Sequence, residues 1–233
     1  MTSSVLGKEG WRWLAAGGAA LLLAAFSMAY LDRPSAYWAR DLPPAFVAFC
    51  ERLTQLGNSA WYLVPLALAI PLIHFAHGRS ADHARKLRLG WLFWAAIFLF
   101  LAIAGSGLLT DLLKVVCGRA RPVLLLRMGD FGWHPPGLTA KLQSFPSGHA
   151  NTITAAAVAL GMLAPRLRTA LIAMAALVLL SRIVVGEHYP SDLVAGVAVA
   201  CATTFPLRAA FARRGLVFRR SEDGGLSLQK LAD

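Results

Sequence analysis

The sequence has few charged side chains, and acidic ones are the scarcest. Only 15% of its 233 residues are charged, with 12 Asp and Glu against 23 Lys and Arg. A soluble domain needs about a quarter of its residues charged to cover its surface. Here 57% are hydrophobic and the mean hydropathy is +0.57. This composition excludes an ordinary soluble globular protein.

Cysteine is also rare. The only three are Cys50, Cys117 and Cys201, which are too few for a disulfide framework and lack the spacing of metal ligands. No pair of carboxylates and no His/Cys cluster near the motifs described below has ligand spacing either. The sequence therefore predicts neither a metal site nor a cofactor.

The net charge of +11 raises the question of a nucleic-acid partner. The basic residues lie in short clusters between and beyond the apolar runs, such as Arg85-Lys86 and Arg213-Arg214. They form no basic stripe with interleaved aromatics on which bases could stack. The pattern is typical of loops that set orientation in a membrane and contact anionic headgroups. We expect membrane lipids as partners, no nucleic acid, and no indication of oligomeric state.

Long apolar runs are what the sequence has in abundance. Six have spanning length: Trp11–Leu31, Ser59–Phe75, Leu89–Leu113, His149–Leu167, Ala170–Val185 and Ser191–Ala210. Helices satisfy their own backbone in lipid, so the runs predict an all-α polytopic membrane protein. We expect residues 1–220 to form one bundle of six transmembrane helices. The polar segment 221–233 is expected to be a disordered cytoplasmic tail.

A shorter helix is predicted between the first two spans. Phe46, Phe49, Leu53 and Leu56 repeat at helical spacing, with polar residues on the other face. This amphipathic pattern favours a helix lying in the membrane interface. The Pro43-Pro44 pair just before it separates it from the first span.

The distribution of Lys and Arg predicts the orientation. If the N-terminus is cytoplasmic, that side also receives the basic cluster at 79–88, the basic residues at 166 and 168, and six more from Arg208 onward. The positive-inside rule then favours both termini in the cytoplasm. We therefore expect a multi-pass membrane protein with six spans and both termini in the cytoplasm.

Chemistry-bearing residues gather at three places where predicted spans end. The groups follow the third span, precede the fourth, and bracket the connection between the fifth and sixth: Lys114 and Arg121; Ser147, Gly148 and His149; Arg182, His188 and Asp192. Ionisable residues at membrane level are costly and often functional. Because the spans alternate in direction, all three groups emerge on one side of the membrane. In the orientation above, that side is opposite the cytoplasm.

These residue types suit a phosphoryl group. The fixed cations Lys114, Arg121 and Arg182 can neutralise its oxygens. Such charge stabilisation supplies much of the rate in phosphoryl transfer. Ser147 and Gly148 form a small-residue turn before a helix, where backbone N–H groups can face an anion.

Two histidines add the means for covalent catalysis. His188 and Asp192 are four residues apart, on one helix face if a helix begins near Pro190. The carboxylate could hold the imidazole tautomer whose free nitrogen attacks phosphorus. His149 would then serve as acid and later as base. By contrast, Arg119, Arg127, His134 and Lys141 are expected only to anchor the chain at the interface.

The three groups resemble the motifs of the type 2 phosphatidic acid phosphatase (PAP2) and vanadium haloperoxidase superfamily. The quoted segments are Lys114-Val-Val-Cys-Gly-Arg-Ala-Arg121-Pro122, Pro146-Ser147-Gly148-His149 and Ser181-Arg182-Ile-Val-Val-Gly-Glu-His188-Tyr-Pro-Ser-Asp192. Their order and gaps are similar to those of its six-helix membrane branch. The resemblance implies a phosphohistidine on His188, oriented by Asp192, with His149 as acid and base. It also implies that the phosphoryl group is bound by Lys114, Arg121, Ser147, Gly148 and Arg182. In bacterial members the site faces the periplasm, so the resemblance implies a protein of the bacterial inner membrane.

Three functions remain open from the sequence. The first is a lipid phosphatase acting on phosphatidic acid, phosphatidylglycerophosphate, a polyprenyl diphosphate or a lipid A phosphate. The second is a phosphotransferase that passes the phosphoryl group to another lipid. The third is a non-enzymatic lipid transporter, which the pairing of His149 with His188 disfavours because binding needs neither an acid nor a nucleophile.

Overall fold

A computed structural model of the chain describes residues 8–220 and 225–229, and this part is mostly helical. The helices are α1 (Lys8–Tyr30), α2 (Asp32–Arg40), α3 (Pro44–Thr54), α4 (Ala60–Arg79), α5 (His83–Cys117), α6 (Pro122–Met128), α7 (Gly148–Leu163), α8 (Arg168–Val184) and α9 (Pro190–Arg213). Short 3-10 turns are η1 (Gln55–Gly57), η2 (Ala140–Leu142) and η3 (Pro165–Leu167), and β1 (Phe218–Arg220) pairs antiparallel with β2 (Leu226–Leu228).

Within residues 8–220 and 225–229, five segments are long and apolar enough to cross a membrane, which makes the chain a multi-pass membrane protein. They are Trp13–Tyr30, Pro44–Arg79, His83–Cys117, Pro165–Val184 and Pro190–Arg213. The predicted fourth span is α7, which has only 16 residues. The number of six spans therefore stays a prediction. So does the interfacial helix, because α3 continues through η1 into α4 as one apolar segment of 36 residues.

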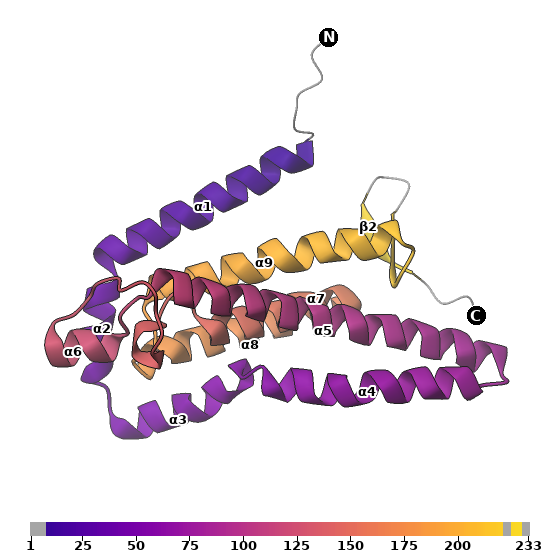
Figure 1. Ribbon diagram of the computed structural model, residues 1–233, viewed down its shortest axis with the longest axis horizontal. Coiled ribbons are helices and arrows are strands. Elements are labelled where there is room, and N and C mark those ends of the chain that lie inside the picture. The colour runs from indigo at the N-terminus through magenta and orange to yellow at the C-terminus, as the bar shows by residue number, and fades with distance from the viewer. Residues whose placement is uncertain (1–7, 221–224, 230–233) are drawn as a thin grey trace, which may run out of the picture.

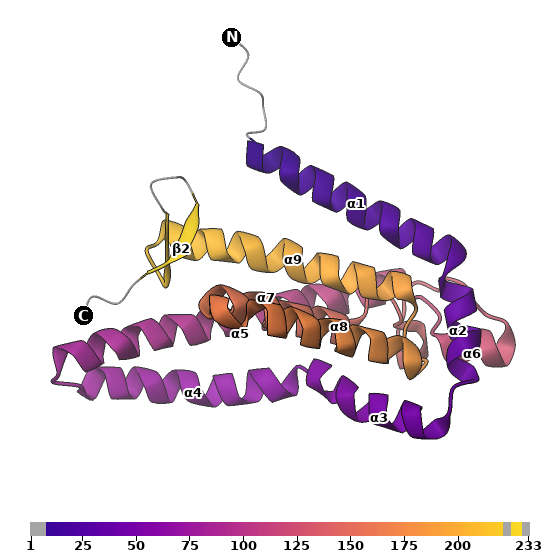
Figure 2. The same ribbon diagram turned by 180° about the vertical axis from the view of Figure 1, so that it is seen from behind.

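The helix α7 forms the centre of the bundle and packs against α5, α8 and α9 (Figures 1 and 2). Its alanines leave little side-chain volume between backbones, which suits close helix packing in a membrane. The two helices approach closely at Gly196 of α9, where an added Cβ would lie 2.6 Å from the Ser147 carbonyl oxygen. The first turn of α7 is thereby fixed on α9.

The helix α1 lies outside this bundle, leaning along α9 at an angle (Figure 1). One contact between the two is the edge-to-face pair of Trp13 and Phe205, with ring centroids 5.3 Å apart. Leu21 and Leu22 are each 74% exposed, as expected for side chains that face lipid.

The bundle has two dissimilar ends (Figure 1). One end gathers α2, α6 and the connections before α7 and α9; the other carries the α4–α5 connection and the β-hairpin. The helix α5 joins them, beginning at the N-cap Asp82 and ending at Gly118, which adopts φ 61°. An added side chain on Gly118 would meet the His134 carbonyl at 2.2 Å, so the turn requires glycine.

Part of the segment expected to be disordered is instead a strand. Phe218 is fully buried against Phe98 and Phe211, and Leu228 packs on the same cluster. The alternating Leu226 and Leu228 explain the difference, because they give this polar segment apolar side chains to bury. Residues 221–224 and 230–233 of the predicted tail lie outside the described residues.

Candidate active site

The structure brings the three predicted groups together at one end of the bundle. Lys114 lies in the last turn of α5, where its ammonium pairs with Asp111 at 2.8 Å. A Cβ added to Gly148 would lie 2.9 Å from the Lys114 Nζ. Glycine at this position thus lets the lysine reach the N-terminus of α7. The convergence predicted from alternating spans is observed.

His149 follows in the first turn of α7 and lies among cations. The charges of Lys114, Arg121 and Arg182 all act on its imidazole. On another side it meets the turn η1, since a Cβ at Gly57 would lie 2.9 Å from the His149 Cβ.

The geometry around His188 defines which of its ring nitrogens is free. Its Nδ1 lies 2.8 Å from the Ser144 carbonyl oxygen and 3.6 Å from the Asp192 carboxylate. A carbonyl only accepts hydrogen bonds, so Nδ1 carries the proton and Nε2 keeps its lone pair. Burial lowers the pKa of His188 to about 4, so the ring is neutral at pH 7. The tautomer is held first by Ser144 rather than, as the sequence suggested, by the carboxylate.

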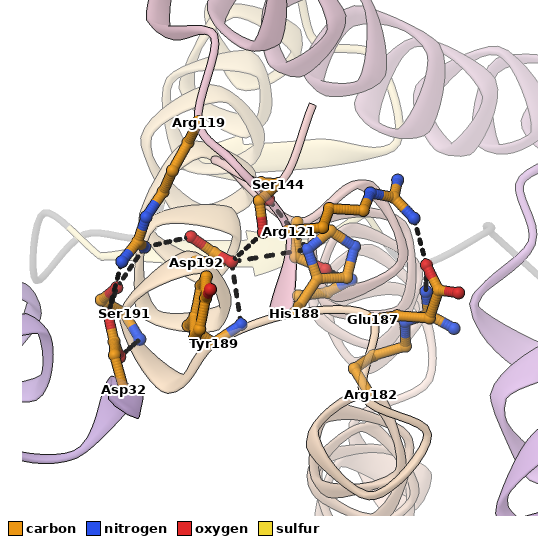
Figure 3. Close-up of polar contacts among 12 residues, drawn as sticks. Asp32, Arg119, Arg121, Ser144, Arg182, Glu187, His188, Tyr189, Ser191 and Asp192 are labelled. Carbon is orange, nitrogen blue, oxygen red and sulfur yellow. Dashed lines mark hydrogen bonds and ion pairs between the residues drawn. The ribbon is translucent and has the colours of Figure 1, made fainter. Parts of the chain in front are cut away.

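Asp192 instead organises the segments around His188 (Figure 3). It accepts hydrogen bonds from the Ser144 hydroxyl at 2.6 Å and from the Tyr189 N–H at 2.8 Å. It also accepts one from the Arg119 guanidinium at 2.5 Å. The same Ser144 thus bonds Asp192 through its hydroxyl and His188 through its carbonyl.

The sequence-based expectation that Arg119 is an interfacial anchor is wrong. Its side chain is fully buried and pairs with Asp32 of α2 at 2.7 Å as well as with Asp192. Ser191 completes the network, accepting from Arg119 at 2.7 Å and donating to Asp32 at 2.5 Å. One guanidinium therefore holds two buried carboxylates, as buried charges require.

Neither Asp32 nor Ser191 was recognised in the sequence. An available signal was that Asp32 is an acidic residue just past an apolar run, which is a costly place for an unpaired charge. Its partner Arg119 is 87 residues away, so no local pattern could connect the two.

On the other side of His188, two predicted phosphate ligands converge on a carboxylate that the sequence analysis missed. Arg121 pairs with Glu187, and Arg182 lies 3.8 Å from the same side chain (Figure 3). Arg182 also donates to the Thr54 hydroxyl of α3 at 3.0 Å. Two guanidinium groups directed at one oxyanion can equally receive another, including a phosphate.

Ser147 has a structural position within the site. Its hydroxyl caps α7 by accepting from the Ala150 N–H at 3.4 Å, and its own N–H donates to the Asp192 carbonyl at 3.0 Å. The side chain is fully buried. The contacts therefore account for Ser147 as a helix cap, which fixes the turn beside Gly148.

The loop at 123–145 covers the buried network. The rings of Phe131 and Trp133 lie 5.3 Å and 5.2 Å from the Arg119 guanidinium carbon, close enough for cation–π attraction. Met128 and Leu138 on the outer side are 76% and 75% exposed. The inner face of the loop thus packs over the helix ends, while its outer face presents apolar side chains.

Comparison with known proteins identifies this arrangement. A model of the PAP2 superfamily matches residues 95–216, more than half of the chain. A lipid A 1-phosphatase from Rhizobium etli is 36% identical over 218 residues, 91% of each protein. One from Rhizobium johnstonii is also 36% identical, over 91% of this chain and 86% of its own.

A solved structure supports the fold. The crystal structure of a transmembrane PAP2-type phosphatidylglycerolphosphate phosphatase from Bacillus subtilis matches with a TM-score of 0.60. The match covers 87% of this chain and 97% of that one at 20% identity, so it speaks for the fold alone. Together with the family match and the two relatives, it shows that the chain belongs to the PAP2 superfamily and is a membrane lipid phosphatase.

Proposed function

We propose that the chain is a lipid A 1-phosphatase that works through a phosphohistidine on His188. The proposed substrate, lipid A 1-phosphate, is supported by the 36% identity to two lipid A 1-phosphatases over 91% of the chain. The mechanism is supported by His188, whose Nδ1 is held by Ser144 so that Nε2 remains available.

In the first half of the reaction, His188 Nε2 attacks phosphorus while the bond from phosphorus to the lipid oxygen breaks. His149 donates its proton to that oxygen, which leaves as the lipid alcohol. The result is a phosphoryl group on Nε2. Asp192 then faces a cationic ring at 3.6 Å, which stabilises the intermediate electrostatically.

In the second half, His149 takes a proton from water as the water oxygen attacks the phosphorus. The bond between phosphorus and Nε2 breaks, inorganic phosphate leaves, and His188 returns to its neutral form. One histidine thus serves as acid and then as base, with no net change in the enzyme.

The phosphate oxygens are bound by Lys114, Arg121, Arg182 and the Gly148 N–H, while Ser147 fixes this turn through its own N–H bond to the Asp192 carbonyl. In the structure Glu187 holds Arg121 and lies near Arg182. Substrate phosphate therefore displaces a carboxylate that is 43% exposed. The clamp stays preorganised between turnovers because Glu187 keeps both guanidinium groups in place.

The test is phosphate release by purified wild-type enzyme from a panel of lipid phosphates in one detergent. We expect the highest kcat/KM with lipid A carrying a 1-phosphate, and lower values with phosphatidic acid and phosphatidylglycerophosphate. Release of free phosphate without an acceptor lipid separates a phosphatase from a phosphotransferase. A higher kcat/KM for any glycerophospholipid would contradict the proposed substrate.

We also propose that the site faces the periplasm of the inner membrane. Leu138 is 75% exposed at the site end, whereas a side chain at neighbouring Gly137 would meet backbone at 2.7 Å. After replacement of the native cysteines, Leu138→Cys should react with a membrane-impermeant thiol reagent in intact spheroplasts. Ala81→Cys, in the exposed α4–α5 connection, should react only after permeabilisation. The opposite pattern would place the site in the cytoplasm.

A further inference from the structure

A cavity of about 430 Å³ lies beside His149, between the start of α4 and the adjoining faces of α5 and α7. Its volume falls within the range of about 300–1,000 Å³ that is usual for ligand pockets. Lys114, Gly148 and His149 form one end of it. The cavity therefore opens onto the acid side of the site, while the Arg121–Glu187–Arg182 cluster lies outside its wall.

The wall changes in character along α5. Near Lys114 it carries the Asp111 carboxylate and also hydroxyl and amide groups, from Thr110 on α5, from Thr152 on α7 and from the Asn58-Ser59 pair just before α4. Ile103 and Leu108 line the other part. Ile103 precedes Lys114 by 11 residues, which places it about 16 Å further toward the bilayer centre. The cavity thus has a polar section at the site and an apolar section in the membrane.

Among the residues of this wall, Thr110 has a feature that points to a bound ligand. Its side chain is fully buried, and within the part of the chain that the structure describes its hydroxyl has no hydrogen-bond partner. Buried hydroxyl groups are normally hydrogen-bonded, because leaving one without a partner is costly. Because Thr110 lines a ligand-sized cavity beside the proposed acid, a bound ligand could supply the partner that its hydroxyl lacks.

We infer that this cavity holds the sugar that leaves the phosphate, and that Thr110 hydrogen-bonds to it. The inference rests on the proposed function, because His149 protonates the leaving oxygen and the leaving group must lie on its side. An acylated sugar offers hydroxyl and amide groups to the polar section and acyl chains to the apolar one. A diacylglycerol would place ester groups and hydrocarbon there, which can accept a hydrogen bond from Thr110 but cannot donate one to it.

The experiment compares kcat/KM for lipid A 1-phosphate and for phosphatidic acid in the same detergent. Thr110→Val keeps the shape of the side chain but removes its hydroxyl. The ratio of the two kcat/KM values, sugar lipid over glycerolipid, should fall about five- to tenfold, as expected for one lost hydrogen bond. Thr110→Ser, which retains the hydroxyl, should restore most of the ratio.

Thr204 on α9 provides a matched control. It is also fully buried with a hydroxyl that has no partner among the described residues, but it is not part of the cavity wall. Thr204→Val should leave the ratio unchanged. If Thr110→Val also leaves it unchanged while wild type hydrolyses both lipids, the inference fails and the proposed function stands. A wild-type enzyme inactive on the sugar lipid would overturn both.

Discussion

His188→Ala is expected to abolish phosphate release while the protein still folds and inserts. The reason is that alanine removes the nitrogen that forms the covalent bond, and no neighbouring group can replace it. Loss of a nucleophile that works within a catalytic unit reduces kcat by at least about 10⁴-fold. The measurement is steady-state phosphate release by purified variant whose thermal unfolding midpoint matches that of wild type.

Two further variants serve as comparisons for the activity of His188→Ala. Asp192→Asn should lose less than His188→Ala, because the Ser144 carbonyl still holds the Nδ1 proton at 2.8 Å and the nucleophile remains. His134→Ala should keep wild-type activity, since this exposed histidine pairs only with Asp130 among the described residues. A folded His188→Ala enzyme with more than a small fraction of wild-type turnover would refute the covalent mechanism.

Arg119→Met is expected to cause the largest loss of stability among single substitutions in the site. It leaves Asp32 and Asp192 as two buried carboxylates without their shared cation, and breaking a buried pair in this way costs about 3–5 kcal/mol. The unfolding midpoint in detergent should fall clearly, and activity should fall with it because Asp192 no longer fixes Ser144 and Tyr189. Thermal unfolding and kcat, measured on the same preparation, report both effects.

A second substitution, at Asp32, tests whether the loss of stability comes from the Arg119–Asp32 ion pair. Asp32→Asn removes one of the two carboxylates, so its combination with Arg119→Met should be less harmful than the sum of the single losses. Arg127→Met on α6 is the matched control, because Arg127 is exposed and should have little effect. Additive losses in the double variant would show that Arg119 and Asp32 are not energetically coupled.

The site motifs were predictable because the chemistry is local in sequence. Lys114 and Arg121 lie within one short segment, and His188 lies four residues from Asp192, so helical periodicity and alternating spans were enough to predict where they meet. The apolar runs likewise predicted most helices, because membrane insertion imposes length and composition on each segment separately.

What the sequence could not predict are pairings between distant segments. Asp32 meets Ser191 across 159 residues, and only the packing of α2 against α9 makes that contact. The Ser144 carbonyl could not be recognised either, because any residue has a backbone oxygen and no side chain marks its use. The 16-residue helix α7 was predicted to be longer because apolar residues continue past its end at Leu163 into η3.

If α7 crosses the membrane as the sequence predicts, its short length sets how deep in the bilayer the reaction takes place. Sixteen residues make a rod of about 24 Å, whereas the hydrocarbon layer is about 30 Å thick. With the C-terminal end of α7 level with one boundary, His149 in its first turn is recessed about 6 Å below the other. To reach His149, a lipid headgroup must then move below the interface toward the bilayer centre, or the surrounding leaflet must become thinner. Host membranes with shorter acyl chains should lower the cost of that step, so bilayer thickness becomes a variable in turnover.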